Sequence, residues 1–211
     1  QSLHYRAKAR ITVRYVEKKQ QVLVGFREKS NPRYIAEIQS CQILDARVGL
    51  KIELLKDLIQ SLESFREIAQ IEVTAGDEHV ALIFRNLSEL SSADQNQLCA
   101  FGETHGFWIY LQPGGEDTVT RIYPLKSDEM LSYCLSSDIH IRFFPGDFIQ
   151  VNPALNRLMV LQAMEWMDLQ VSDKVLDLFC GLGNFSLPMA KMCQHVTGIE
   201  GDEKMIVRAR E

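Results

Sequence analysis

The sequence lacks the features that mark membrane, secreted and disulfide-stabilised proteins. No run of apolar residues is long enough to cross a bilayer, and residues 1–20 carry too much charge for a secretory signal peptide. The five cysteines are odd in number and widely spaced, so neither a disulfide framework nor a C-x-x-C zinc motif is indicated. These absences predict a soluble, cytoplasmic, monomeric protein without a membrane partner.

Acidic residues are scarce at the N-terminal end of the chain. Residues 1–33 contain nine lysines and arginines but only Glu17 and Glu28, a local net charge of +7. The whole chain carries −5, so the remaining residues carry −12. This imbalance predicts that any attraction to nucleic acid is concentrated at the N-terminal end.

A glycine-containing loop follows an apolar strand at residues 175–186 (VLDLFCGLGNFS). Gly181 and Gly183 let the backbone approach a ligand closely, and the helix that follows presents free N–H groups. Glu200 ends the next apolar segment, at the distance where a doubly wound fold places the acid that accepts ribose hydroxyls. The pattern predicts a nucleotide-cofactor site, and the alternative is an ordinary strand-to-helix turn.

The amino-acid sequence of this loop indicates which cofactor it binds. A dinucleotide fingerprint requires a third small residue, glycine or alanine, where this chain has Ser186, so a nicotinamide-dependent oxidoreductase is disfavoured. Asp177, four residues before the first glycine, completes a segment that resembles motif I of class I S-adenosylmethionine-dependent methyltransferases. The resemblance favours methyl transfer.

Basic residues alternate with small or apolar ones in residues 5–16, and residues 21–27 follow after a polar turn, which predicts a hairpin. Its first strand directs four cations to one face, where they would meet RNA phosphates: Arg6, Lys8, Arg10 and Arg14. Tyr5 and Tyr15 are available for stacking on bases. The alternative is a solvated outer face of a sheet.

The remaining periodicity predicts two domains. Residues 1–124 form an α+β domain in which two helices cover an antiparallel sheet. Its further elements are a strand at 34–38, a helix at 48–62, paired strands at 68–75 and 79–85, a helix from 91 to about 105, and a strand at 107–111. The face of the first helix that packs on the sheet consists of Leu50, Leu54, Leu55, Leu58, Ile59 and Leu62.

Residues 125–211 are expected to begin an α/β Rossmann-like methyltransferase domain. They contain a predicted hairpin of 139–144 with 148–151 and a long helix at 153–169, before the glycine loop. Only two strands of a doubly wound sheet follow residue 170, and the chain begins at Gln1 without a methionine. We therefore expect a fragment of a longer protein, truncated at both ends.

Motifs along nearly the whole chain resemble the RNA uracil-C5 methyltransferases, in particular the bacterial group that acts on 23S ribosomal RNA and carries an iron–sulfur cluster. The motifs are 5–10 (YRAKAR), 24–30 (VGFREKS), 90–94 (LSSAD), 144–152 (FPGDFIQVN) and 176–185 (LDLFCGLGNF). The resemblance implies S-adenosylmethionine as methyl donor. It implies contacts to this donor from Gln150, Phe179, Asn184 and Glu200, alongside Gly181 and Gly183.

In this family a cysteine thiolate adds to C6 of uracil and makes C5 nucleophilic. The family's cysteine lies in a Ser-Cys-Asn-Pro segment, which this sequence lacks. We therefore expect no catalytic residue in this chain, and no activity from the chain alone. The different-class alternative is a non-catalytic RNA-binding module with a vestigial cofactor loop.

Cys41 occupies the place of the family's fourth iron–sulfur ligand, because it follows a strand within Gln39-Ser-Cys41-Gln42. The family has Gln-Cys-Pro at that place, and the three companion ligands would lie before Gln1. Four thiolates normally hold a [4Fe–4S] cluster, so we do not expect this chain to retain one. A buried structural cysteine is the alternative.

Overall fold

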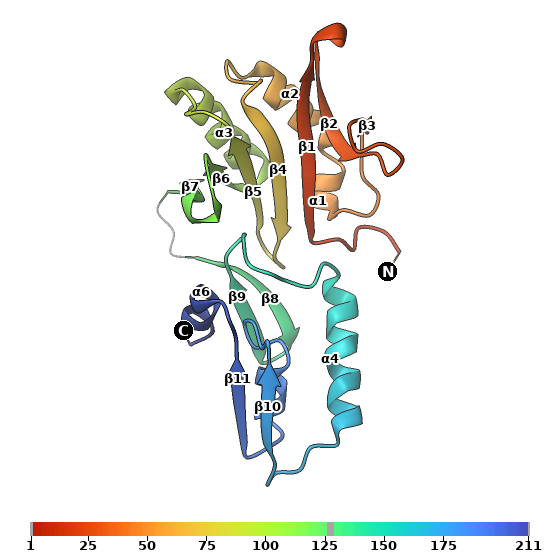
Figure 1. Cartoon of the computed structure of the whole chain (residues 1–211), viewed down its shortest axis with the longest axis vertical. Coiled ribbons are helices and arrows are strands. Elements are labelled where there is room, and N and C mark those ends of the chain that lie inside the picture. The colour runs from red at the N-terminus through yellow and green to blue at the C-terminus, as the bar shows by residue number, and fades with distance from the viewer. Residues whose placement is uncertain (1, 126–128, 211) are drawn as a thin grey trace. The chain divides into compact units, whose positions relative to one another are not determined.

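The computed structural model describes residues 2–125 and 129–210, which form a mixed α/β structure with one large sheet (Figure 1). The chain divides into two compact units, unit 1 (Gln1–Glu129) and unit 2 (Met130–Glu211). The predicted division into an α+β RNA-facing domain (1–124) and a methyltransferase domain (125–211) stays a prediction. No helix of the described ranges is long and apolar enough to cross a membrane.

Unit 1 contains a seven-stranded sheet with the order β3-β2-β1-β4-β5-β6-β7. The strands are β1 (Lys8–Val16), β2 (Gln21–Arg27), β3 (Ile35–Glu37), β4 (Ile68–Ala75), β5 (Val80–Asn86), β6 (Phe107–Gln112) and β7 (Thr120–Tyr123). Short 3₁₀ turns, η1 (Glu17–Lys19) and η2 (Glu116–Thr118), follow β1 and precede β7. The two hairpins predicted within this unit, β1–β2 and β4–β5, are confirmed.

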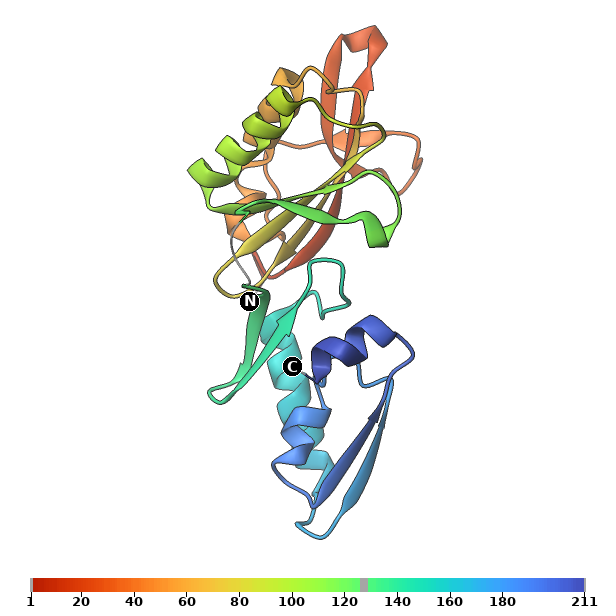
Figure 2. The same ribbon diagram turned by 90° about the vertical axis from the view of Figure 1, so that its left-hand side faces the viewer.

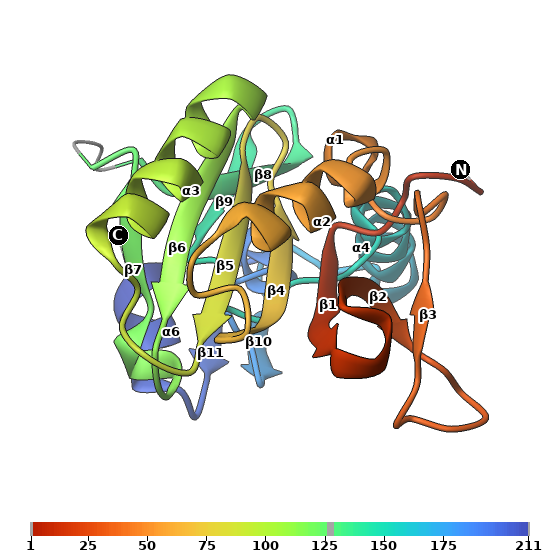
Figure 3. The ribbon, with the colours of Figure 1, turned by 90° about the horizontal axis from the view of Figure 1, so that it is seen from above.

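The prediction of a purely antiparallel sheet is wrong at one place, because β5 and β6 run parallel. The connection between them is α3 (Ser92–His105), which crosses over the sheet and returns the chain in the same direction. The Ser91 side chain caps this helix by accepting the N–H of Asp94, and Gly106 ends it with a φ of 73°. Helices α2 and α3 lie over the same face of the sheet (Figure 3).

The predicted helix at 48–62 is in fact two helices, α1 (Ala46–Gly49) and α2 (Ile52–Ser61). Leu50 lies in the break between the two helices and is 58% exposed, and Leu54 lies at the edge of the buried face of α2 and is 42% exposed. The face that packs on the sheet consists of Ile52, Leu55, Leu58 and Ile59. Leu62, also predicted there, is buried just beyond the helix.

Unit 2 contains two two-stranded sheets and three helices among its described residues. The elements are β8 (Leu131–Ser136), β9 (Ile139–Phe143), α4 (Pro153–Met167), β10 (Lys174–Leu178), α5 (Ser186–Ala190), β11 (His195–Ile199) and α6 (Glu203–Ala209). Helix α4 packs against β8, and β10 lies parallel to β11 (Figure 2). The predicted βαβ arrangement around the glycine loop is thereby confirmed.

The predicted partner of the strand at 139–144 is wrong. Strand β9 pairs with β8 and not with residues 148–151, which form no strand. A turn closes at Phe144, whose N–H donates to the Asp147 carboxylate at 2.7 Å and whose carbonyl accepts the Asp147 N–H at 2.9 Å. The chain leaves this turn without extending along β9, and Phe148, which follows the turn, is 73% exposed.

Candidate cofactor site

The parallel pair β10–β11 brings the glycine loop and Glu200 to the same edge of unit 2. Leu178 and Ile199 are register partners, so the residues that follow each strand are neighbours. The loop turns sharply through three residues with positive φ, Phe179 at 62°, Gly181 at 55° and Gly183 at 92°. A left-handed conformation is unusual for an aromatic residue, and such backbone occurs preferentially at functional sites.

Glu200 ties the two loops together with its carboxylate. Its Oε2 accepts the N–H of Gly181 at 2.9 Å, and its Oε1 accepts those of Gly201 and Asp202 at 2.7 and 3.1 Å. The hydrogen bond from the Asp202 backbone and then that from Gly181 hold the pKa of Glu200 below its usual range. Glu200 is therefore a structural anchor of the loop as well as a candidate ligand.

Close packing between the loop and β11 explains why serine is tolerated at position 186. A Cβ on Gly198 would lie 2.7 Å from Cys180 Sγ and 3.5 Å from Ser186 Oγ. The small residue that permits helix and strand to approach therefore lies on the strand, at Gly198. The Ser186 hydroxyl donates to the Asp177 carboxylate at 2.6 Å, which fixes the start of α5 to β10.

Asn184 belongs to a buried polar network that sequence reasoning missed. Its Oδ1 accepts Asn156 Nδ2 at 2.8 Å and the Tyr133 hydroxyl at 3.0 Å, and its Nδ2 donates to Asn156 Oδ1 at 2.9 Å. Asn156 is 3% exposed, and burial raises the pKa of Tyr133 to about 12. The network joins α4, β8 and the glycine loop.

Gln150 lies far from the glycine loop in sequence but lines the same cavity as Phe179, Gly181 and Asn184. The segment that carries it is anchored by Asp147, whose carboxylate pairs with Arg208 of α6. Glu200 is not one of the lining residues, but it accepts the N–H of Gly181, which is. Gly183 is buried within the loop and does not line the cavity. Its positive φ allows the loop to turn.

Four aromatic side chains also line the cavity, namely Tyr133, Phe148, Phe179 and Phe185. Phe179 is 87% exposed, which excludes the interpretation of this residue as core. Aromatic faces and a few convergent polar groups are typical of sites for purine-containing ligands. Asn156 lies on the buried face of α4, and a polar residue on the apolar face of a predicted helix could have marked it as part of a site. No pattern in the sequence marks Tyr133.

The four predicted RNA-binding cations, Arg6 just before β1 and Lys8, Arg10 and Arg14 on it, differ in their surroundings. Lys8 and Arg10 both pair with Glu72, at 3.2 and 3.1 Å, and the Arg6 Nε donates to the Lys8 carbonyl at 3.0 Å. Arg14 donates to the Arg33 carbonyl at 2.8 Å and is exposed. Glu72 on β4 therefore offsets one of the two positive charges at the centre of the predicted basic face.

The surroundings of Cys41, Cys99 and Cys180 bear on the predicted iron–sulfur ligand and on nucleophilic chemistry. Cys41 is buried, and its N–H donates to the Gly49 carbonyl at 2.8 Å. Within residues 2–125 and 129–210, no group of three or more histidine, cysteine or acidic side chains could hold a metal ion. Burial raises the pKa of the Cys99 and Cys180 thiols, which disfavours the nucleophilic form.

The chain is similar to known proteins over nearly its whole length. The family model described as "tRNA (Uracil-5-)-methyltransferase" matches residues 1–210. A 23S rRNA (uracil(1939)-C(5))-methyltransferase RlmD of Legionella pneumophila (strain Corby) is 52% identical over 207 residues, 98% of this chain and 47% of the relative. The RlmD of Hahella chejuensis is 48% identical over 205 residues, 97% of this chain and 46% of the relative. The chain spans about half the length of these curated relatives.

One solved structure is similar over the whole chain. It is the tRNA (uracil-54, C5)-methyltransferase of Pyrococcus abyssi in complex with S-adenosyl-L-homocysteine, with a TM-score of 0.72 and 20% identity. The match covers 100% of this chain and 52% of the other chain. At this identity the likeness shows a shared mixed α/β fold.

Proposed function

The chain belongs to the tRNA (uracil-5-)-methyltransferase family, and from this premise we propose that it is part of an enzyme that methylates C5 of a uridine in 23S ribosomal RNA. S-adenosylmethionine supplies the methyl group from its positively charged sulfur. The observation that carries the proposal is the convergence of Gln150 and the glycine loop on one cavity. This convergence joins the two motifs that a cofactor site of this family would need.

Glu200 would accept a ribose hydroxyl of the cofactor through Oε2. Both lone pairs of Oε1 are engaged by Gly201 and Asp202, whereas Oε2 accepts a single N–H, from Gly181. A carboxylate oxygen accepts two hydrogen bonds, so Oε2 retains one position for the ligand. The lowered pKa of Glu200 keeps the acceptor charged at neutral pH.

Asn184 would act on the cofactor as a donor. Its Oδ1 already accepts from Asn156 and Tyr133, while its Nδ2 donates one of two hydrogens to Asn156. The remaining N–H of this amide is the group it can offer to an acceptor atom in the cavity. Phe179 would contribute its exposed ring, and a ring face attracts both a purine and a sulfonium cation.

We propose that β10 and β11 belong to a larger doubly wound sheet of the Rossmann-like class. Leu176 and Leu178 on β10 are each 57% exposed, and Ile199 on β11 is 51% exposed. Parallel sheets are normally covered on both faces, so these side chains favour further structure against them. The cysteine that would add to C6 of uracil is proposed to lie outside these 211 residues.

Unit 1 is proposed to face RNA through its basic N-terminal segment, in a cytoplasmic, monomeric enzyme. Among the four predicted cations the geometry favours Arg14, because Glu72 engages Lys8 and Arg10. An iron–sulfur role for Cys41 would require three thiolates from elsewhere, since no metal-holding group is present in the described part of the chain. No step of the proposed function depends on a cluster.

Calorimetric titration of the 211-residue chain with S-adenosylhomocysteine tests the cofactor site. We expect binding, and Glu200→Ala should weaken it by about 1–3 kcal/mol because a charge-assisted hydrogen bond is lost. Glu165→Ala, which removes an exposed acid of α4, is the matched control and should bind normally. Binding of NAD in preference to S-adenosylhomocysteine, or equal affinities of the wild type and Glu200→Ala, would contradict the proposal.

A further inference from the structure

The β1–β2 hairpin continues beyond the point where β1 leaves β4. Strand β1 pairs with β4 only as far as Thr12 and Gln70, whereas its pairing with β2 runs on to Val16 and Gln21. The pairing of β4 with β5 shifts register between Ile68 and Gln70. A groove therefore opens within unit 1, between the end of β1 and the residues that lead into β4.

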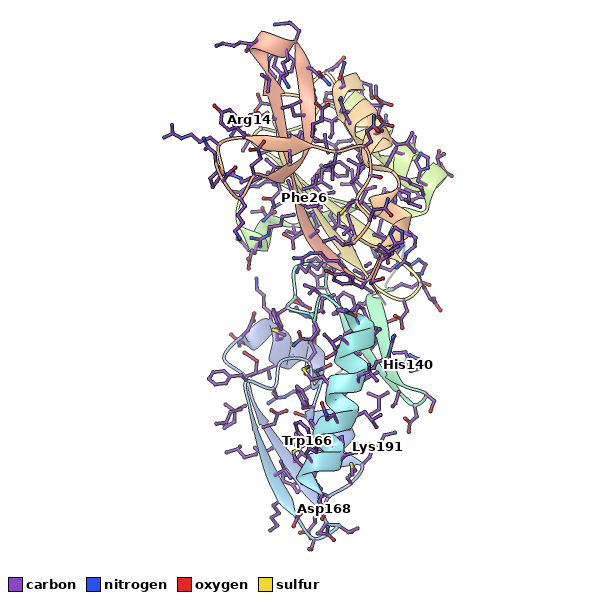
Figure 4. All side chains as sticks on the ribbon, turned by 90° about the vertical axis from the view of Figure 1, so that its right-hand side faces the viewer. Arg14, Phe26, His140, Trp166, Asp168 and Lys191 are labelled. Atoms are coloured by element: carbon purple, nitrogen blue, oxygen red, sulfur yellow. The ribbon has the colours of Figure 1, made fainter. Side chains whose placement is uncertain are left out.

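Three arginines line this groove against one acid. The polar and aromatic residues that line this groove, called the hairpin groove, are Thr12, Arg14, Tyr15, Glu17, Arg27 and Arg66, and the rest of its lining is apolar. Arg14 and Arg27 are exposed, and Figure 4 shows Arg14 at the β1–β2 hairpin. Guanidinium groups bind phosphate oxygens in a planar, bidentate manner, so their convergence favours a phosphodiester ligand.

Arg66 is oriented by aromatic side chains before any ligand arrives. Its guanidinium carbon lies 4.3 Å from the ring centre of Tyr15 and 4.6 Å from that of Phe65. The two rings themselves meet edge to face at 4.9 Å. Stacking restricts the guanidinium without using its N–H groups, which leaves them for an anion.

The acid that now meets Arg66 is a weak competitor. Glu17 lies 3.3 Å from Arg66, and their side chains are 69% and 53% exposed. Exposed ion pairs of this kind contribute little, so a phosphate can replace the carboxylate. The Arg10 side chain is 69% exposed, but its partner Glu72 is only 10% exposed and also pairs with Lys8, so this carboxylate is held more firmly than Glu17.

We propose that the hairpin groove binds the backbone of single-stranded RNA, with phosphates on Arg14, Arg27 and Arg66. The single-stranded form is favoured because the Tyr15 ring and the stacked Arg66 plane offer surfaces on which unpaired bases stack. The inference rests on the proposed function only in its choice of RNA as the ligand. The groove contacts carry affinity and no sequence selection.

Fluorescence anisotropy of a labelled oligo(U) RNA with the full 211-residue chain, at several salt concentrations, tests the proposal. Each of Arg14→Ala, Arg27→Ala and Arg66→Ala should lower the slope of log affinity against log salt by about 0.7. Arg10→Ala removes the same charge from the same strand, outside the groove, and should leave the slope unchanged. Equal losses in Arg10→Ala and the groove variants would overturn the groove as the site.

Arg66→Lys separates the stacked guanidinium from simple positive charge. We expect it to keep the salt slope and to weaken binding, because lysine cannot stack or bind in a bidentate manner. Wild-type affinity in this variant, or equal competition by free inorganic phosphate at the same concentration of phosphate groups, would overturn the stacked RNA site. Binding of S-adenosylhomocysteine should be normal in every groove variant, so a failed groove and a failed cofactor site are recognised separately.

Discussion

Asn156 and Asn184 face each other in unit 2 and exchange two side-chain hydrogen bonds, of 2.8 and 2.9 Å. One asparagine is on α4 and the other follows Gly183 in the glycine loop. A reciprocal amide pair fixes the orientation of both side chains, because rotation of either would oppose donor to donor. The pair therefore determines which face of Asn184 is presented to the cavity.

Asn156→Ala should weaken cofactor binding although Asn156 does not line the cavity. The change leaves the amide of Asn184 with fewer partners, which costs about 1–3 kcal/mol of stability. We expect weaker binding of S-adenosylhomocysteine in calorimetry at a temperature where the variant is folded, as judged by circular dichroism. Gln162→Ala on the exposed side of the same helix is the control. Normal affinity in folded Asn156→Ala would show that the pair is only structural.

Tyr133 should be recognisable by its titration. Burial raises its pKa to about 12, so the folded state retains the phenol proton where an unfolded chain, with a pKa near 10.0, has lost it. Its contribution to stability is complete below the unfolded pKa and is lost as pH rises from there through about 12. Absorbance titration of the six tyrosines should show a late component that Tyr133→Phe reduces, while burial also raises the pKa of Tyr110, which keeps its own late titration in this variant. A late component of unchanged amplitude in Tyr133→Phe would contradict the raised pKa of Tyr133.

Local signals in the sequence are sufficient for much of the fold. Gly76-Asp77 predicts the β4–β5 turn, Ser91 and Gly106 bound α3, and Asn152 begins α4 by accepting the N–H of Leu155. In each case the determinant is a cap or a turn whose chemistry involves neighbouring residues. The glycine loop and Glu200 are also predictable, because strand direction and spacing alone bring them together.

Long-range pairing is where sequence reasoning fails. The parallel contact of β5 with β6 and the choice of β8 as partner of β9 depend on crossovers and competing strands that no local pattern specifies. The ion pairs of Glu72 with Lys8 and Arg10 could not be predicted either, because they depend on the strand register that places Glu72 beside Arg10. The polar network of Tyr133, Asn156 and Asn184 joins three distant segments and could not be predicted from any one of them.

Gly198→Ala should disrupt the contact between β11 and the glycine loop. The added Cβ would lie 2.7 Å from Cys180 Sγ and 3.2 Å from Cys180 Cβ, so the loop must shift. Overpacking of this kind costs about 1–3 kcal/mol of stability, measurable by urea unfolding. Gly201→Ala is the matched control, because a Cβ there meets no atom within 4 Å. Equal stabilities of the two variants would show that the loop yields freely at Cys180.

Glu200→Gln tests whether the charge of Glu200 holds the cofactor loop. The carboxylate accepts three backbone N–H groups, whereas the amide nitrogen of glutamine would face at least one of them as a second donor. The pKa of Glu200 is lowered from 4.5, so its contribution to stability is present above that value and is lost as pH falls through the lowered pKa. Thermal unfolding in the acid range should therefore depend less on pH in Glu200→Gln than in the wild type. Binding of S-adenosylhomocysteine should weaken in Glu200→Gln at neutral pH, because both the loop and the ribose acceptor change. Wild-type acid unfolding combined with weak cofactor binding would restrict Glu200 to the ligand, and loss of neither property would remove it from the site.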